Sequence, residues 1–366
     1  MTTGFVFHEK YLWHDTGNQW LTLTHVPPMQ PLQHVESPET KRRFKNLLHV
    51  TEIWSDLIEL KPRQATKAEL LRVHEEAYID KVETLSKKHG GNAGLDAPFG
   101  RSGYDIFSLT AGGTIMALDA VVTGQVDNAY ALVRPPGHHA LPDKGYGFCI
   151  FNNIAVAIRH AFATHQLNRI AVVDWDVHHG NGTEAIFYNE SDVLTISIHQ
   201  ELCFPPNTGY IEDNGAGEGT GYNLNIPLPS GSGHGAYITA MEQLVVPALQ
   251  QYKPDLIIVA NGLDANMFDP MGRMMAWSET YRVMTQMMLD VAATCCEGRL
   301  VINHEGGYSE AYVPYCGLAV IETLLGKSSG WEDPYKPVCE GKEQQALRPH
   351  QTALIQSIEP LLDQIR

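Results

Sequence analysis

Short apolar runs alternate with longer amphipathic stretches over most of this chain. Runs rich in Val, Ile and Leu predict strands at 129–133, 170–173, 193–198, 256–260 and 300–303. Helical periodicity predicts helices at 66–88, 104–122, 153–164, 235–251 and 278–296. Apolar strands interleaved with amphipathic helices favour an α/β fold, in which helices cover both faces of a mainly parallel sheet.

The two ends of the chain differ from this pattern. Residues 1–50 are spotted with Pro and His and are weakly periodic, so an irregular N-terminal arm is expected there. Residues 352–366 predict an amphipathic helix docked on the body of the protein. Because the sequence contains no internal repeat or linker-like stretch, residues 1–366 are expected to form a single domain.

Composition narrows the class of protein. The chain has 366 residues, 43% of them hydrophobic, and a net charge of −16, which disfavours a nucleic-acid-binding role. Its six cysteines include no C-x-x-C pair, which favours reduced thiols. There is no recognisable secretory signal, and no apolar run approaches the roughly 20 residues that span a bilayer. A cytoplasmic homo-oligomer without a membrane partner is expected.

The candidate catalytic groups follow the ends of the predicted strands. Arg-Pro-Pro-Gly-His-His follows the first strand at 134–139, and Asp-Trp-Asp-Val-His-His-Gly-Asn-Gly follows the second at 174–182. Asn-Gly-Leu-Asp at 261–264 and His-Glu-Gly-Gly-Tyr at 304–308 follow two others. Open α/β sheets bind ligands beyond the carboxyl ends of their strands, so these loops are predicted to meet in one crevice.

Two of these loops carry the residue types of a metal site. Alternate residues of an extended segment face the same side, which brings Asp174, Asp176 and His178 together. Asp176, His178 and Asp264 would supply the three ligands that a catalytic metal typically takes. Asp174 is an equally acceptable ligand by spacing, and the donor set suits Zn(II), Mn(II) or Fe(II).

Other residues in these loops are candidates for acid–base and polarising roles. The adjacent imidazoles of His138 and His139 could share general acid and base work. Tyr308, after two glycines, could donate a hydrogen bond to a developing oxyanion. Phe148, after Gly147, could form an aromatic pocket wall, although a core position is equally compatible with the sequence.

Together these motifs resemble the histone deacetylase superfamily, most closely its class II branch and the bacterial histone deacetylase-like amidohydrolases. The resemblance extends from about residue 29 to the C-terminus. Its specific parts are the motifs at 134–139, 147–153, 174–182, 262–264 and 305–308.

The resemblance implies an arginase/deacetylase-like three-layer fold with a central, mainly parallel eight-stranded sheet. It also implies a role for each matching residue. The implied zinc ligands, for one Zn²⁺, are Asp176, His178 and Asp264, and the implied acid–base pair is His138 and His139. Tyr308 would polarise the carbonyl, and the walls of the substrate tunnel would include Gly147, Phe148 and Phe204. A structural K⁺ would lie near Asp174, Asp176 and His178, with Ser197 and Ile198 close by. Asn181 stands where class I deacetylases have an acid, so the histidine pair is expected to be tuned differently.

The implied activity is zinc-dependent removal of acetyl or other acyl groups from lysine side chains in peptides or proteins. The alternatives are hydrolysis of small acetylated polyamines and a non-catalytic acyl-lysine-binding protein. The D-x-D-x-H order argues against an arginase, which would need D-x-H-x-D. Residues 266–275 are largely apolar and include Arg273, which favours acyl-lysine, whereas Asp269 and the net charge favour a polyamine.

Overall fold

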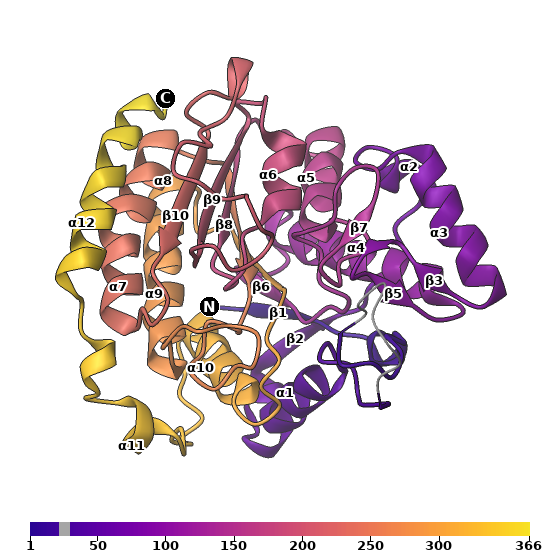
Figure 1. Ribbon diagram of the computed structural model, residues 1–366, viewed down its shortest axis with the longest axis horizontal. Helices are drawn as coiled ribbons and strands as arrows, with labels where there is room; N and C mark the ends of the chain where they lie inside the picture. Colours follow the sequence, from indigo (N-terminus) through magenta and orange to yellow (C-terminus); the bar gives the residue numbers. More distant parts are fainter. Residues whose placement is uncertain (22–29) are drawn as a thin grey trace.

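A single parallel sheet of eight strands forms the centre of the computed structural model, which describes residues 1–21 and 30–366 (Figure 1). The strand order is β10-β9-β8-β11-β12-β6-β1-β2, and every pairing is parallel. The predicted α/β fold with a parallel sheet is therefore confirmed. The strands are β1 (Thr3–Val6), β2 (Leu57–Leu60), β6 (Asn128–Ala131), β8 (Ile170–Asp174), β9 (Val193–Gln200), β10 (Asn223–Leu228), β11 (Leu256–Asn261) and β12 (Leu300–His304).

The central strands are apolar throughout because both of their faces are covered. In β11, Ile257 and Val259 pack into one hydrophobic core, whereas Leu256, Ile258 and Ala260 pack into the other. Successive side chains of a strand point to opposite faces, so a continuous apolar run supplies both cores.

Helices cover the two faces of the sheet, as Figure 1 shows. The helices α4 (Gly103–Val122) and α5 (Asn153–Thr164) pack together on one face, with α2 (Lys67–Leu70) and α3 (Glu76–Lys88) outside them. The other core lies beneath α1 (Glu39–Val50), α7 (His234–Ala240), α8 (Val246–Tyr252), α9 (Ser278–Cys295) and α10 (Val313–Leu325). The remaining helices are α6 (Asn181–Phe187), α11 (Lys336–Cys339) and α12 (Pro349–Ile358), and α12 lies along α7.

One helix departs from the expectation that no apolar run is long enough to span a bilayer. The helix α4 is long and apolar enough to cross a bilayer, yet 78% of its 18-residue apolar segment is buried within the protein. It packs against β1, β6 and α5, which is the environment of a core helix.

The irregular arm predicted for residues 1–50 is wrong at two places. Thr3–Val6 forms β1, which lies inside the sheet between β6 and β2, and Glu39–Val50 forms α1. A four-residue strand is too short to show a periodic pattern, and its partners are distant in sequence.

Two predicted helices have different bounds in the structure. The helix predicted at 66–88 is interrupted between α2 and α3. The C-terminal helix ends at Ile358 and is followed by a 3₁₀ turn over Glu359–Gln364.

Candidate active site

The four strands that precede the candidate catalytic loops are neighbours in the sheet. The order β8-β11-β12-β6 places the loops after Asp174, Asn261, His304 and Ala131 side by side at one edge. All of these strands are parallel, so their carboxyl ends lie at the same edge. The sheet order thus brings the sequence motifs together.

Asp176, His178 and Asp264 form a buried cluster at this edge. His178 Nδ1 lies 2.9 Å from Asp176 Oδ1 and 3.4 Å from Asp264 Oδ2. Backbone N–H groups orient the carboxylates: Gly306 donates to Asp176 Oδ2 at 2.8 Å, and Val177 donates to Asp264 Oδ1 at 2.8 Å. One nitrogen and two carboxylates therefore converge on one point.

The cluster fits a divalent metal ion. The buried Asp264 Oδ2 has no hydrogen-bond partner within the described part of the chain. Burial, followed by the adjacent Asp176 carboxylate, raises the pKa of Asp264 to about 6, and a bound cation would relieve this repulsion. A Cβ at Gly306 would lie 2.1 Å from Asp264 Oδ2, so only glycine leaves this space free.

Asp174, which the spacing left as a possible ligand, supports a histidine instead. Its Oδ2 lies 2.9 Å from His138 Nδ1, and its Oδ1 accepts the backbone N–H of Asp176 at 3.0 Å. Both oxygens thus have hydrogen-bond partners, and Asp174 is not one of the three converging ligands.

The histidine pair has two different partners. The rings of His138 and His139 lie with centroids 3.9 Å apart. Burial alone would lower the pKa of His138, but the Asp176 and Asp174 carboxylates raise it to about 10. His139 Nδ1 lies 2.7 Å from the neutral Asn181 Oδ1, and burial together with His138 holds the pKa of His139 well below its usual range. Within the pair, His138 is therefore the charged member and His139 the neutral one.

Two buried charged residues hold the histidine loop in place. Glu305, directly after β12, accepts the backbone N–H groups of Gly137 at 2.6 Å and His138 at 3.0 Å. The Arg134 guanidinium pairs with Glu36 and also donates to the carbonyls of Tyr11 and His14. Glu36 lies within the segment predicted as an irregular arm, so part of that arm supports the site.

A cavity of about 250 Å³ opens beside these groups. His139, His178 and Tyr308 line it, and Phe148 and Phe204 contribute aromatic side chains. The Phe148 and Tyr308 rings meet edge to face at 5.8 Å, and Phe204 meets His139 in the same way at 5.1 Å. Two phenylalanine rings, two imidazoles and one phenol thus surround a space large enough for a side chain of a substrate.

The turn at Gly147 and Phe148 has an unusual backbone conformation. Both residues have positive φ, at 50° and 68°. A Cβ at Gly147 would lie 2.5 Å from His139 Cδ2, so glycine is needed there. Positive φ costs a residue such as phenylalanine about 1–3 kcal/mol, and such strain is typical of functional sites.

Sequence reasoning missed several lining residues. Leu21, Asp96, Cys203 and Met271 also line the cavity. Met271 lies in the segment 266–275 from which the substrate was predicted, whereas Leu21, Asp96 and Cys203 were assigned no role. Asp96 lies just after β4 (Gly94–Leu95), and β4 pairs with β7 (Gly145–Tyr146). Asp96 therefore reaches the site through a contact between segments that are distant in sequence.

Asp269, in contrast, is buried and accepts the backbone N–H groups of Tyr308 and Ser309, so it is not available to a substrate amine.

The residues associated with a potassium ion are only partly brought together. Asp174 and Ser197 line a second, much smaller cavity of about 10 Å³, together with Gly180 and Glu184. Ile198 does not line it, and its side chain packs in the hydrophobic core.

Comparison with known proteins agrees with this geometry. The histone deacetylase domain model matches residues 34–324. The chain is 52% identical to a histone deacetylase-like amidohydrolase from Pseudomonas aeruginosa, covering 92% of this chain and 90% of the relative. It is 38% identical to a probable deacetylase from Archaeoglobus fulgidus, over 89% and 87% of the two chains. The crystal structure of the HDA15 HD domain superposes with a TM-score of 0.86 at 31% identity, covering 99% of this chain and 94% of that one. The chain belongs to the histone deacetylase family.

Proposed function

We propose that this protein is a zinc-dependent amidohydrolase that removes acetyl or other acyl groups from lysine side chains. The observation that carries the proposal is the buried Asp176–His178–Asp264 cluster beside a cavity that His139 and Tyr308 also line. Bound by these three residues, zinc would act as a Lewis acid toward the amide carbonyl and lower the pKa of a water toward about 7.

His139 is placed to move the proton during amide hydrolysis. Asn181 Oδ1 can only accept a hydrogen bond, so Nδ1 of His139 carries the proton and Nε2 keeps its lone pair. The ring lines the cavity, so Nε2 can take a proton from the attacking water and return it to the leaving amine. Asp174 holds the neighbouring His138 through its Nδ1.

Tyr308 supplies a hydrogen-bond donor. Burial, followed by the Asp264 and Asp176 carboxylates, raises the pKa of the Tyr308 phenol well above its usual range, so it stays protonated at neutral pH. A protonated phenol in the cavity wall can stabilise the negative charge that develops on the amide oxygen.

Replacing Asn181 with aspartate should change the pH dependence of the reaction. A carboxylate 2.7 Å from His139 Nδ1 favours the protonated imidazole, whereas the proposed base must be neutral. The acid limb of the kcat/KM profile should therefore move up by about 1 to 3 pH units in Asn181→Asp. The exposed Asn189→Asp serves as the control. An unchanged acid limb in Asn181→Asp would rule out His139 as the base.

The cavity favours an acyl group on a slender stem. Its walls, Phe148 and Phe204, can bury methylene groups at about 0.8 kcal/mol each. Both acyl-lysine and acetylated polyamines have such a stem, so the walls do not distinguish them. We propose acyl-lysine because residues 266–275 add no available carboxylate, since Asp269 is buried. Asp96 favours the alternative, since its carboxylate lines the cavity and could pair with a second ammonium group.

Turnover of an acetyl-lysine peptide and of acetylputrescine should distinguish these substrates. We expect kcat/KM to be higher for the peptide. The alternative holds if acetylputrescine is preferred tenfold. Asp96→Asn sharpens the test, because an amide oxygen still accepts a peptide N–H but no longer attracts an ammonium group. Selective loss of acetylputrescine turnover in this variant would assign Asp96 to a polyamine. A zinc-loaded protein that turns over neither substrate would contradict the proposed activity.

The small cavity at Asp174 and Ser197 is where we propose the structural potassium ion. Its volume of about 10 Å³ approaches that of one water-sized probe. The Asp174 carboxylate and Ser197 hydroxyl are oxygen donors, which suit a hard cation. An increase in thermal stability with KCl that choline chloride does not reproduce would support this site.

A further inference from the structure

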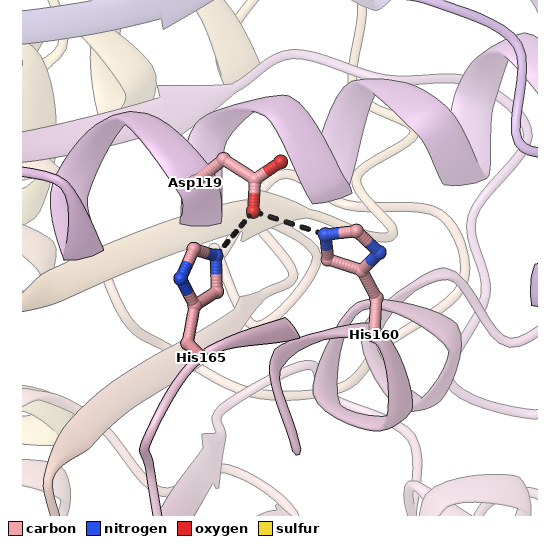
Figure 2. A group of neighbouring side chains, drawn as sticks. All are labelled: Asp119, His160 and His165. Atoms are coloured by element: carbon pink, nitrogen blue, oxygen red, sulfur yellow. Dashed lines mark hydrogen bonds and ion pairs between the residues drawn. The ribbon is translucent and has the colours of Figure 1, made fainter. Parts of the chain in front are cut away.

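A second group of potential metal ligands lies between helices α4 and α5. Figure 2 shows Asp119 of α4 facing His160 of α5 and His165, the residue that directly follows α5. Asp119 Oδ1 lies 3.1 Å from His160 Nε2 and 2.8 Å from His165 Nε2. None of the three belongs to the catalytic cluster or lines the cavity beside it.

We propose that Asp119, His160 and His165 bind a second divalent transition-metal ion of the zinc class. Two imidazole nitrogens and one carboxylate oxygen form a donor set that such ions prefer. Ligands about 2.0 Å from a tetrahedral ion are about 3.3 Å apart, so contacts of 2.8 and 3.1 Å need only a small expansion.

The surroundings of His160 support a metal ligand. Its other ring nitrogen, Nδ1, is buried and lies 3.0 Å from Glu69 Oε1, without forming a hydrogen bond within the described part of the chain. A carboxylate beside Nδ1 favours the tautomer that carries its proton there, which leaves Nε2 free to bind a metal. Arg63 neutralises much of the charge of Glu69 through a two-point contact at 2.6 and 2.8 Å, which leaves Asp119 as the main negative charge facing the two rings.

The three side chains of this site are partly buried but remain accessible to solvent. The side chains of Asp119 and His165 are 26% and 19% exposed, whereas that of His160 is 9% exposed. A metal could therefore enter from solvent and keep a water as its fourth ligand. The ion would join α4 to the end of α5 and act as a structural clamp.

The competing interpretation is a hydrogen-bond network in which Asp119 Oδ1 accepts from the Nε2–H groups of both imidazoles. Asp119→Asn separates the two, because the amide oxygen still accepts hydrogen bonds but is a much weaker metal ligand. His165→Ala is a second variant, which removes a partly exposed ligand at the end of a helix. The exposed His350→Ala controls for non-specific histidine binding.

The test is the zinc content of the full chain after equilibrium dialysis against buffered Zn²⁺ at pH 7.5. We expect two ions per chain in the parent and in His350→Ala, and one in Asp119→Asn and in His165→Ala. In Asp264→Ala, where the catalytic cluster is broken, one ion should remain, and zinc should still raise Tm. Adding His165→Ala to that variant should abolish both effects.

The proposal is overturned if folded Asp119→Asn and His165→Ala bind as much zinc as the parent. It is also overturned if folded Asp264→Ala binds no zinc. Neither outcome depends on deacylase activity, so the second site and the proposed function can fail separately.

Discussion

Asp264→Ala should lower the metal content by one ion per chain and nearly abolish amide hydrolysis. Asp264 supplies one of only three ligands and holds the buried oxygen that has no other partner in the described residues. Loss of Lewis-acid catalysis worth about 4 kcal/mol corresponds to about a thousandfold in kcat/KM. Metal analysis and acetyl-lysine turnover on the same sample measure both effects.

Asp176→Ala should have the same two effects, because Asp176 is the other carboxylate of the cluster. The exposed Asp363→Ala is the matched control and should keep full metal content and activity. If Asp264→Ala and Asp176→Ala both retain all of their metal, the assignment of the catalytic ligands is wrong. A variant that loses metal yet retains full turnover would show that the reaction does not use this ion.

Tyr308→Phe should keep the fold and the metal but lose about 3 to 4 kcal/mol of transition-state stabilisation, or about 100- to 1000-fold in kcat. The phenylalanine ring retains the edge-to-face contact with Phe148, so only the hydroxyl is removed. KM should change little, because the hydrogen bond strengthens as charge develops on the amide oxygen.

Tyr210→Phe, at an exposed position, tests whether removing a tyrosine hydroxyl has a general effect on turnover. A kcat for Tyr308→Phe within threefold of the parent would contradict the oxyanion role. A drop in metal content would instead assign Tyr308 to the integrity of the metal site.

The sequence alone determined the central strands β6, β8, β9, β11 and β12, most of the helices that cover them and the loops that carry chemistry. The central strands are recognisable because burial on both faces requires continuous apolar runs, as in 256–260. The functional motifs are recognisable because each one directly follows such a run, at 174–182 and 304–308 for example. Parallel strands bring these positions to one edge of the sheet, so residues from separate motifs could be assigned to one site.

Tertiary structure decided the features that depend on contacts between distant segments. Thr3–Val6 becomes a strand only because β6 and β2 pair with it on both sides. Asp96 reaches the cavity through the pairing of β4 with β7, and Asp174 is assigned to His138 only by the directions of its two oxygens. Asp119 and His160 belong to no motif and meet because α4 packs on α5. Hydrophobic periodicity specifies which face of an element is buried, but not which side chains of other elements will lie against it.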